Sequence, residues 1–224
     1  MRKVENEEKV PSFIEGYSAT SKIRVLRVIA RMNVGGPAIQ VTNLEKNLDA
    51  NSFEHLLVAG ECEYGELDYL EANSISISMR KVSGLGRSIS LAKDLAAFFE
   101  IRQIIRDFHP QIVHTHTAKA GVLGRLAALS LKRRIILVHT FHGHLLKGYF
   151  SKFKTRLVII FERFLSHFTR ALVSVGAQVR DELLQANIGN FEKFIIINPG
   201  LEIKTKLDRE SMRSTLGIPH SSFV

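Results

Sequence analysis

The chain has 224 residues, of which 45% are hydrophobic and 24% are charged, a composition that is ordinary for a globular domain. Its net charge of +9 attracts anions in general, namely nucleic acid, acidic lipids or phosphorylated small molecules, and does not choose among them. A run of about eighteen apolar residues is missing, which excludes a typical membrane-spanning helix, and the single Cys62 excludes an internal disulfide.

The first twenty residues mix charged side chains with few apolar ones. A secretory signal peptide needs an apolar segment, so we expect none here and predict a disordered polar tail over residues 1–21. Together with the single cysteine, this pattern indicates a cytoplasmic protein.

After this tail, apolar runs of strand length alternate with longer segments of helical period, which is typical of repeated strand–helix units. We therefore predict an α/β fold with a doubly wound, mostly parallel, Rossmann-like sheet of about seven strands. The predicted strands are Ile23–Ala30, His55–Ala59, Ile75–Met79, Gln111–Thr115, Ile135–Thr140, Ala171–Val175 and Phe194–Ile197.

Between the strands the sequence predicts helices, and Pro37 is well placed to open the first of them. The clearest is Leu91–Phe108, whose apolar residues recur every three to four positions before Pro110 ends it. The others are Glu66–Ala72, a small-residue helix around Gly124, Phe150–Phe168, Ala177–Ala186 and Asp208–Leu216. Residues 22–205 form one predicted domain, and 206–224 read as the start of a connection to a further domain.

Ligands of open α/β sheets bind beyond the carboxyl ends of the strands, and glycines follow the first strand at that edge. The amides of Gly35 and Gly36 could approach a phosphate or a sugar, although a tight turn would also explain them. The loop is neither a Walker P-loop nor a Gly-x-Gly-x-x-Gly fingerprint, which disfavours kinases and dehydrogenases.

Histidines mark the same edge. His114 and His116 end the fourth strand, and His139, His142 and His144 end the fifth. No acidic residue accompanies them, so we expect no metal and favour hydrogen bonds to sugar hydroxyls, phosphate binding or general acid–base chemistry.

Residues 147–170 place Phe and Leu side chains on one helical face and Lys and Arg side chains on another. Two interpretations stay open: a basic amphipathic helix on an anionic membrane, and a core-facing helix with a solvated basic edge.

Four loops together resemble family 4 glycosyltransferases. Their residues are Val34-Gly35-Gly36, His114-Thr115-His116-Thr117, Thr140-Phe141-His142-Gly143 and Asn198-Pro199-Gly200. The resemblance covers nearly the whole chain from Lys22 onward, and the order and spacing of the loops carry it. It implies one half of a GT-B architecture, the N-terminal acceptor-side domain, facing a donor-binding domain that this sequence lacks.

The resemblance also implies roles for single residues. His142 would lie near the reacting sugar as the catalytic residue, with Gly143 beside it. The other implied substrate-binding residues are Gly35 and Gly36 at the donor phosphate, His116 on the acceptor side, Ser174 and Gly200. To these we add Lys119, whose charge suits an acceptor phosphate. The family's turn is Asn-Gly, whereas this chain has Asn198-Pro199-Gly200.

The implied function is retaining, metal-independent transfer of a hexose from a nucleoside-diphosphate sugar to a polysaccharide, glycolipid or other glycan acceptor. The family's Glu-x7-Glu donor motif is missing here, so the isolated chain should transfer sugar poorly. Two alternatives stay open: a nucleotide-sugar epimerase of the same fold, and a non-catalytic acceptor- or membrane-binding subunit of a split enzyme. Nucleic-acid binding is disfavoured because the basic residues are dispersed.

Overall fold

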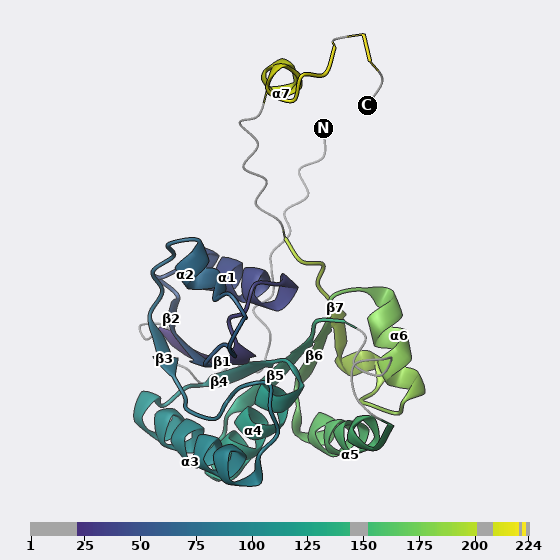
Figure 1. The fold of residues 1–224 in the computed structure, drawn as a ribbon. Helices are drawn as coiled ribbons and strands as arrows, with labels where there is room; N and C mark the ends of the chain where they lie inside the picture. The colour runs from purple at the N-terminus through teal and green to yellow at the C-terminus, as the bar shows by residue number, and fades with distance from the viewer. Residues whose placement is uncertain (1–21, 144–151, 201–207, 220, 223–224) are drawn as a thin grey trace, which may run out of the picture.

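The computed structural model describes residues 22–143, 152–200, 208–219 and 221–222. Within them, seven strands form one sheet in the order β3-β2-β1-β4-β5-β6-β7, and every neighbouring pair is parallel. The predicted doubly wound α/β sheet is therefore confirmed (Figure 1). The strands are β1 (Ile23–Arg31), β2 (Phe53–Gly60), β3 (Met79–Lys81), β4 (Ile112–His116), β5 (Ile136–Phe141), β6 (Ala171–Ser174) and β7 (Phe194–Ile196).

Helices connect the strands and cover both faces of the sheet. They are α1 (Gly36–Asn47), α2 (Tyr69–Ala72), α3 (Leu91–Phe108), α4 (Ala118–Leu129), α5 (Lys152–Phe168), α6 (Ala177–Gln185) and α7 (Arg209–Thr215). Helices α1 and α2 lie on one face, and α3 to α6 lie on the other, while α7 lies apart from the sheet (Figure 1). The predicted tail, residues 1–21, and the predicted boundary at residue 205 lie outside the described residues.

The central strand β1 is buried without interruption from Val25 to Ala30. A parallel strand that is covered on both faces needs such a continuous run, because alternate side chains enter two different cores. Val28 packs toward α3 and α4, whereas Ile29 packs toward α1 and α2.

The third strand differs from its prediction. The alternation of Ile75, Ile77 and Met79 predicted a strand ending at Met79, but β3 begins there, where Met79 pairs with Leu57. Ile75 and Ile77 still pack against the core beneath α1 and α2. The apolar residues of this segment therefore pack against the core as expected, but the hydrogen bonds to β2 begin only at Met79.

Helix α4 lies unusually close to the sheet because of two glycines. A Cβ atom on Gly121 would lie 2.5 Å from Cε1 of His139, and one on Gly124 would lie 2.8 Å from Cγ2 of Thr115. Both distances are shorter than van der Waals contact, so side chains at these positions would push the helix away. The small-residue helix predicted here is confirmed, and its glycines fix the position of its N-terminus.

Helix α5 turns a different side inward than the core-facing interpretation requires. Its buried residues include Glu162, Leu165 and Ser166. The aromatic and aliphatic stripe predicted from the sequence is exposed instead: Leu157, Phe161, Phe164 and Phe168, together with Ile160, are each 41–53% exposed. Of the two interpretations of this helix, core burial of the stripe is therefore wrong for these residues. Among the described residues, no helix has the length and hydrophobicity to cross a bilayer.

The strand order reverses direction at β1. After β1 the chain rises through α1 on one face, whereas after β4, the neighbour of β1, it continues through α4 on the other face. Such a switch point leaves a crevice between the diverging loops at the carboxyl ends of the strands. The candidate site lies in this crevice.

Candidate functional site

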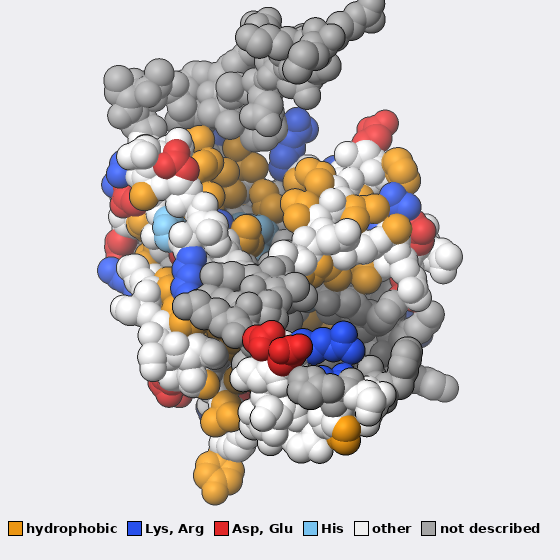
Figure 2. Space-filling view, turned by 90° about the horizontal axis from the view of Figure 1, so that it is seen from above, with side chains coloured by type: hydrophobic (Ala, Val, Ile, Leu, Met, Phe, Trp, Pro, Cys, Tyr) orange, Lys and Arg blue, Asp and Glu red, His pale blue; other side chains and the backbone are white. Residues whose placement is uncertain are grey.

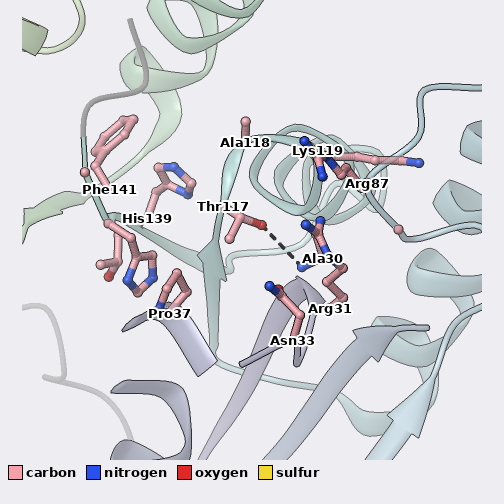
Figure 3. Close-up of a pocket in the computed structure, with 14 residues that line it drawn as sticks. Ala30, Arg31, Asn33, Pro37, Arg87, Thr117, Ala118, Lys119, His139 and Phe141 are labelled. Atoms are coloured by element: carbon pink, nitrogen blue, oxygen red, sulfur yellow. Dashed lines mark hydrogen bonds between the residues drawn. The ribbon is translucent and has the colours of Figure 1, made fainter. Parts of the chain in front are cut away.

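A cavity of about 350 Å³ opens where β1, β4 and β5 end (Figure 3). The start of α4 and the loop before α3 complete its walls. The residues lining it are Ala30, Arg31, Asn33, Pro37, Gly86, Arg87, Thr117–Lys119 and His139–Gly143. From above, hydrophobic side chains gather in the middle of the molecule with histidines among them (Figure 2).

Three histidines form a chain on one face of the sheet. The register pairs His114 with Val138 and His116 with Thr140, which places both rings on the face that carries α1. Nε2 of His114 lies 2.8 Å from Oγ1 of Thr140, and Nδ1 of His116 lies 2.9 Å from Nε2 of His142. The chain leads from the buried strand β4 to His142 at the cavity wall.

The fourth histidine, His139, belongs to the opposite face. It pairs with Thr115 across the ladder, and its Nδ1 lies 2.8 Å from Oγ1 of Thr115, beneath α4. The predicted histidines are thus divided between the two faces of the sheet: His114 and His116 lie in β4 and His139 lies in β5, whereas His142 follows β5. His144 lies outside the described residues.

Burial keeps these histidines neutral. Loss of hydration, aided by the charge of Arg27, lowers the pKa of His114 to about 3. Loss of hydration also lowers the pKa of His142 to about 4 and holds the pKa values of His116 and His139 well below the usual range. At neutral pH each ring therefore offers one donor and one acceptor, not a positive charge.

His142 is left with one unused ring nitrogen. Its Nε2 is shared with His116, and its Nδ1 has no partner among the described residues, although the residue lines the cavity. A neutral imidazole nitrogen at a cavity wall can exchange a hydrogen bond with a sugar hydroxyl. Deeper in the chain, Nε2 of His116 is buried and has no hydrogen-bond partner in the described part of the molecule.

The ammonium group of Lys119 is already occupied. Nζ lies 2.7 Å from the carbonyl oxygen of Gly84, 2.6 Å from that of Ser88 and 2.5 Å from Oδ1 of Asp94. Two of these contacts are hydrogen bonds to carbonyl oxygens, and the third is an ion pair that neutralises the charge of the ammonium group. Lys119 therefore holds the loop before α3 in place from within the cavity wall.

The other predicted binding residues are spread along the same edge of the sheet. Gly35 and Gly36 do not line the cavity, but Asn33 and Pro37 on either side do, and the space above Gly36 is open. Ser174 is fully buried, and its Oγ has no partner in the described residues. The carbonyl oxygen of Gly200 accepts a hydrogen bond of 3.1 Å from Nδ2 of Asn43 on α1.

The structure thus gathers His142, Gly143 and Lys119 around one cavity, with His116 behind them, and leaves Ser174 and Gly200 outside it. Sequence reasoning missed Arg31 and Arg87 as lining residues. Their positions in the sequence could have identified them, because Arg31 ends β1 and Arg87 lies in the Ser/Gly-rich loop after β3.

Thr117 was also missed, and its backbone is strained. It precedes α4 with φ 66° and ψ 157°, a region that is essentially reserved for glycine. Its Oγ1 accepts a hydrogen bond of 3.3 Å from the backbone N–H of Ala30 (Figure 3). This contact ties the end of β1 to the start of α4, and both residues line the cavity.

Comparisons with known proteins agree with this geometry. A curated relative is the UDP-Gal:alpha-D-GlcNAc-diphosphoundecaprenol alpha-1,3-galactosyltransferase of Escherichia coli, 27% identical over 161 residues. The match covers 70% of this chain and 41% of that protein, so the chain spans about two fifths of its relative's length.

Solved structures share the fold. A glycosyltransferase from Rickettsia africae matches with a TM-score of 0.62 at 19% identity, over 89% of this chain and 51% of its own. The UDP-GlcNAc 2-epimerase of Methanocaldococcus jannaschii, in complex with UDP-GlcNAc and UDP, matches with a TM-score of 0.59 at 13% identity, over 78% and 46%.

The family model described as Glycosyltransferase Family 4 matches residues 34–204, which contain most of the residues that line the cavity. This match covers well over half of the chain, and it includes the loops after β4 and β5 and the loop after β1 from Val34 onward. The chain belongs to Glycosyltransferase Family 4.

Proposed function

We propose that this chain is the N-terminal, acceptor-side domain of a retaining glycosyltransferase, which moves a hexose from a nucleoside-diphosphate sugar to a glycan or lipid-linked acceptor. One observation carries the proposal: a cavity opens at the ends of β1, β4 and β5, and His142, which lies in the part that matches the family, is in its wall. A second domain, in the same polypeptide or in a partner chain, would bind the donor and close the cleft.

In this proposal His142 is the catalytic residue near the reacting sugar. Its low pKa supports a neutral ring that positions a sugar hydroxyl by a hydrogen bond. The backbone of Gly35 and Gly36, at the start of α1, suits a donor phosphate, because a helix N-terminus favours negative charge and the space above Gly36 is open. Transfer would need no metal, and a chelator such as EDTA should leave the activity unchanged.

The experiment follows from the role of His142. In the complete two-domain enzyme, His142→Ala should lower kcat by at least about a hundredfold, the scale of one acid–base or hydroxyl-positioning group, and leave the unfolding temperature nearly unchanged. His109→Asn, at an exposed turn, is the matched control and should retain full activity. Unchanged turnover in His142→Ala would remove the catalytic role.

The size of the native protein decides where the second domain resides. Immunoprecipitation from the source cell followed by intact-mass measurement should give about twice 25.2 kDa if a domain of similar size continues the chain. A mass near 25.2 kDa would instead direct the search to a partner polypeptide.

An epimerase is the second candidate, because an epimerase of UDP-GlcNAc shares the fold. Fold likeness at this level of identity does not decide the reaction. Incubation with a nucleotide sugar in the absence of an acceptor distinguishes the two: an epimerase releases an epimerised sugar, whereas a transferase leaves the sugar unchanged.

An anionic membrane surface is a further proposed partner. The E. coli relative is named for an acceptor linked to diphosphoundecaprenol, which is a lipid. The exposed stripe of α5, with Phe161, Phe164 and Phe168, is flanked by the exposed Arg156 and Arg163. Aromatic side chains beside arginines suit the interface of an anionic bilayer, and such binding would place the enzyme at the inner face of the membrane.

Vesicle flotation tests this surface. The protein should float with vesicles that contain anionic lipid and remain unbound with neutral ones, and Phe161→Ser together with Phe164→Ser should reduce flotation. Phe99→Ser, which changes an exposed phenylalanine on α3, provides the control. Equal flotation of all variants would contradict the proposal.

A further inference from the structure

Three cationic side chains line the cavity, and only one of them lacks a carboxylate partner. Nζ of Lys119 lies 2.5 Å from Oδ1 of Asp94, and Nε of Arg31 lies 2.7 Å from Oε2 of Glu66. Arg87 forms no ion pair and no hydrogen bond through its side chain within the described residues. The uncompensated positive charge of the cavity therefore belongs to Arg87.

The loop that carries Arg87 is held from several sides. Lys119 binds the carbonyl groups of Gly84 and Ser88, and the N–H of Ser88 donates to Oε1 of Glu63 at 3.1 Å. Leu85 is fully buried in the core beneath α3 and α4. Arg87 thus projects from a backbone that is fixed before any ligand arrives, which lowers the cost of binding.

Arg31 and Arg87 together leave a net positive charge beside the carboxylate of Glu66. Burial alone would raise the pKa of Glu66, but a backbone hydrogen bond, the contact with Arg31 and the nearby charge of Arg87 lower it below the usual value. Two guanidinium groups thus act on one carboxylate. The first turn of α4, at Thr117–Lys119, faces the same cavity and adds the positive end of a twelve-residue helix.

The walls of the cavity differ in character. Arg31, Arg87 and Lys119 lie on one side, and His139 and Phe141 lie on the other (Figure 3). His142 and Gly143 follow Phe141 in the chain and also line the cavity. A ligand that fills the space would therefore place an anionic group at the arginines and a neutral, hydroxyl-bearing group at His142.

We propose that Arg87 binds a phosphate group of the acceptor, so that the acceptor substrate is a phosphorylated sugar or a lipid-linked sugar diphosphate. This inference rests on the proposed function. A guanidinium group matches two phosphate oxygens at once, whereas the ammonium group of Lys119 is consumed by the loop. The acceptor-phosphate role predicted for Lys119 thus passes to Arg87, and Lys119 becomes a positioning residue.

Equilibrium binding to the 224-residue chain tests the inference without any transfer reaction. The probes are N-acetylglucosamine 1-phosphate and inorganic diphosphate for the acceptor, UDP for the donor, and N-acetylglucosamine as the uncharged comparison. Calorimetric titration should show binding of the first two probes and much weaker binding of the uncharged sugar. Arg87→Ala should weaken binding of the sugar phosphate by about tenfold, the effect of one charge-assisted hydrogen-bonding group.

Two control variants separate the site from general electrostatics. Arg106→Ala removes an exposed arginine at the far end of α3 and should leave sugar-phosphate binding unchanged. Arg87→Lys keeps the charge without the planar fork and should bind between wild type and Arg87→Ala. Lys119→Met should weaken binding too, because the loop then loses its two hydrogen bonds from Lys119 and Asp94 on α3 loses its ion pair.

Three results would overturn the inference. Equal losses in Arg87→Ala and Arg106→Ala would show that only the net charge attracts the anion. Weakened UDP binding with no binding of sugar phosphate would assign Arg87 to the donor. Absence of binding by every phosphate probe would remove the site. None of these results bears on transfer itself, so a failure of the proposed function stays distinguishable.

Discussion

Nδ1 of His116, inside β4, lies 2.9 Å from Nε2 of His142, in the loop after β5. One of the two rings donates and the other accepts, because burial lowers both pKa values and keeps both rings neutral. The orientation of the cavity-lining histidine is thus set by a fully buried one.

The buried histidines predict a loss of stability in acid. Unfolded histidines titrate near pH 6.5, whereas the folded pKa values are about 4 for His142 and about 3 for His114. Below pH 6.5 the unfolded state takes up protons first, so stability is complete above that pH and falls as the pH drops toward the folded values. Each such histidine contributes at most about 1.4 kcal/mol per pH unit, and urea unfolding at about pH 7.5 and about pH 5 measures the sum.

Single replacements identify the groups responsible. His114→Gln should reduce the dependence of the unfolding free energy on pH by about one proton between pH 6.5 and pH 5. His109→Asn changes an exposed residue with φ 52°, a conformation that asparagine tolerates, and should leave the dependence unchanged. The same slope in wild type and His114→Gln would contradict this assignment.

The strained backbone of Thr117 predicts that a glycine variant at this position is more stable than an alanine variant. Thr117→Gly and Thr117→Ala both lose the hydrogen bond from Ala30, but only Thr117→Gly relieves the strain of about 1–3 kcal/mol. The glycine variant should therefore be more stable than the alanine variant by about 1 kcal/mol or more in urea unfolding. Ala118→Gly, one position later and inside α4, should destabilise the protein, and a stabilised Ala118→Gly would undermine the comparison.

The close approach of α4 makes Gly121 sensitive to any side chain. Alanine normally stabilises a helix relative to glycine, but here its Cβ would meet His139 at 2.5 Å. Gly121→Ala should therefore destabilise the fold by about 1–3 kcal/mol, as overpacking does. Gly36→Ala, in α1 with nothing within 4 Å, is the matched control and should cost little in thermal unfolding. A neutral Gly121→Ala would show that α4 shifts freely.

The ion pair of Arg125 and Glu162 joins α4 to α5 in a fully buried place. Nη2 of Arg125 lies 2.6 and 2.7 Å from the two carboxylate oxygens, and both side chains are inaccessible to solvent. Glu162→Ala leaves an unpaired buried charge and should cost about 3–5 kcal/mol in urea unfolding. Arg125→Met combined with Glu162→Leu should recover most of that loss. A double variant as unstable as Glu162→Ala would contradict this.

The sheet could be predicted from the sequence because its strands are buried on both faces and read as apolar runs. The α3 prediction, Leu91–Phe108, matches the helix observed, since its apolar period is regular and Pro110 ends it. His142 and Gly143 could be placed at the cavity because the ends of neighbouring parallel strands converge. These successes rest on local period and on topology, and for Gly143 on the resemblance to family 4 glycosyltransferases.

The predictions that failed depended on contacts between side chains that are distant in the sequence. Periodicity showed that α5 has an apolar stripe, but the buried pair of Glu162 with Arg125 turns the opposite side inward. The charge of Lys119 suggested a free cation, yet Asp94, on α3, neutralises it. Arg87 reaches the cavity only through a loop that Lys119 fastens, and no local pattern reports such a contact.

The strand order also means that the two neighbours of β1 are synthesised at different times. Arg24, near the start of β1, contacts Glu54 across 30 residues but Gln111 across 87 residues. At about 5–20 residues per second, the β4 side of β1 waits seconds longer for its neighbour than the β2 side does. During that interval an apolar strand edge is open to other nascent chains, and the arginines at 24, 27 and 31 of β1 are the charges that discourage such pairing.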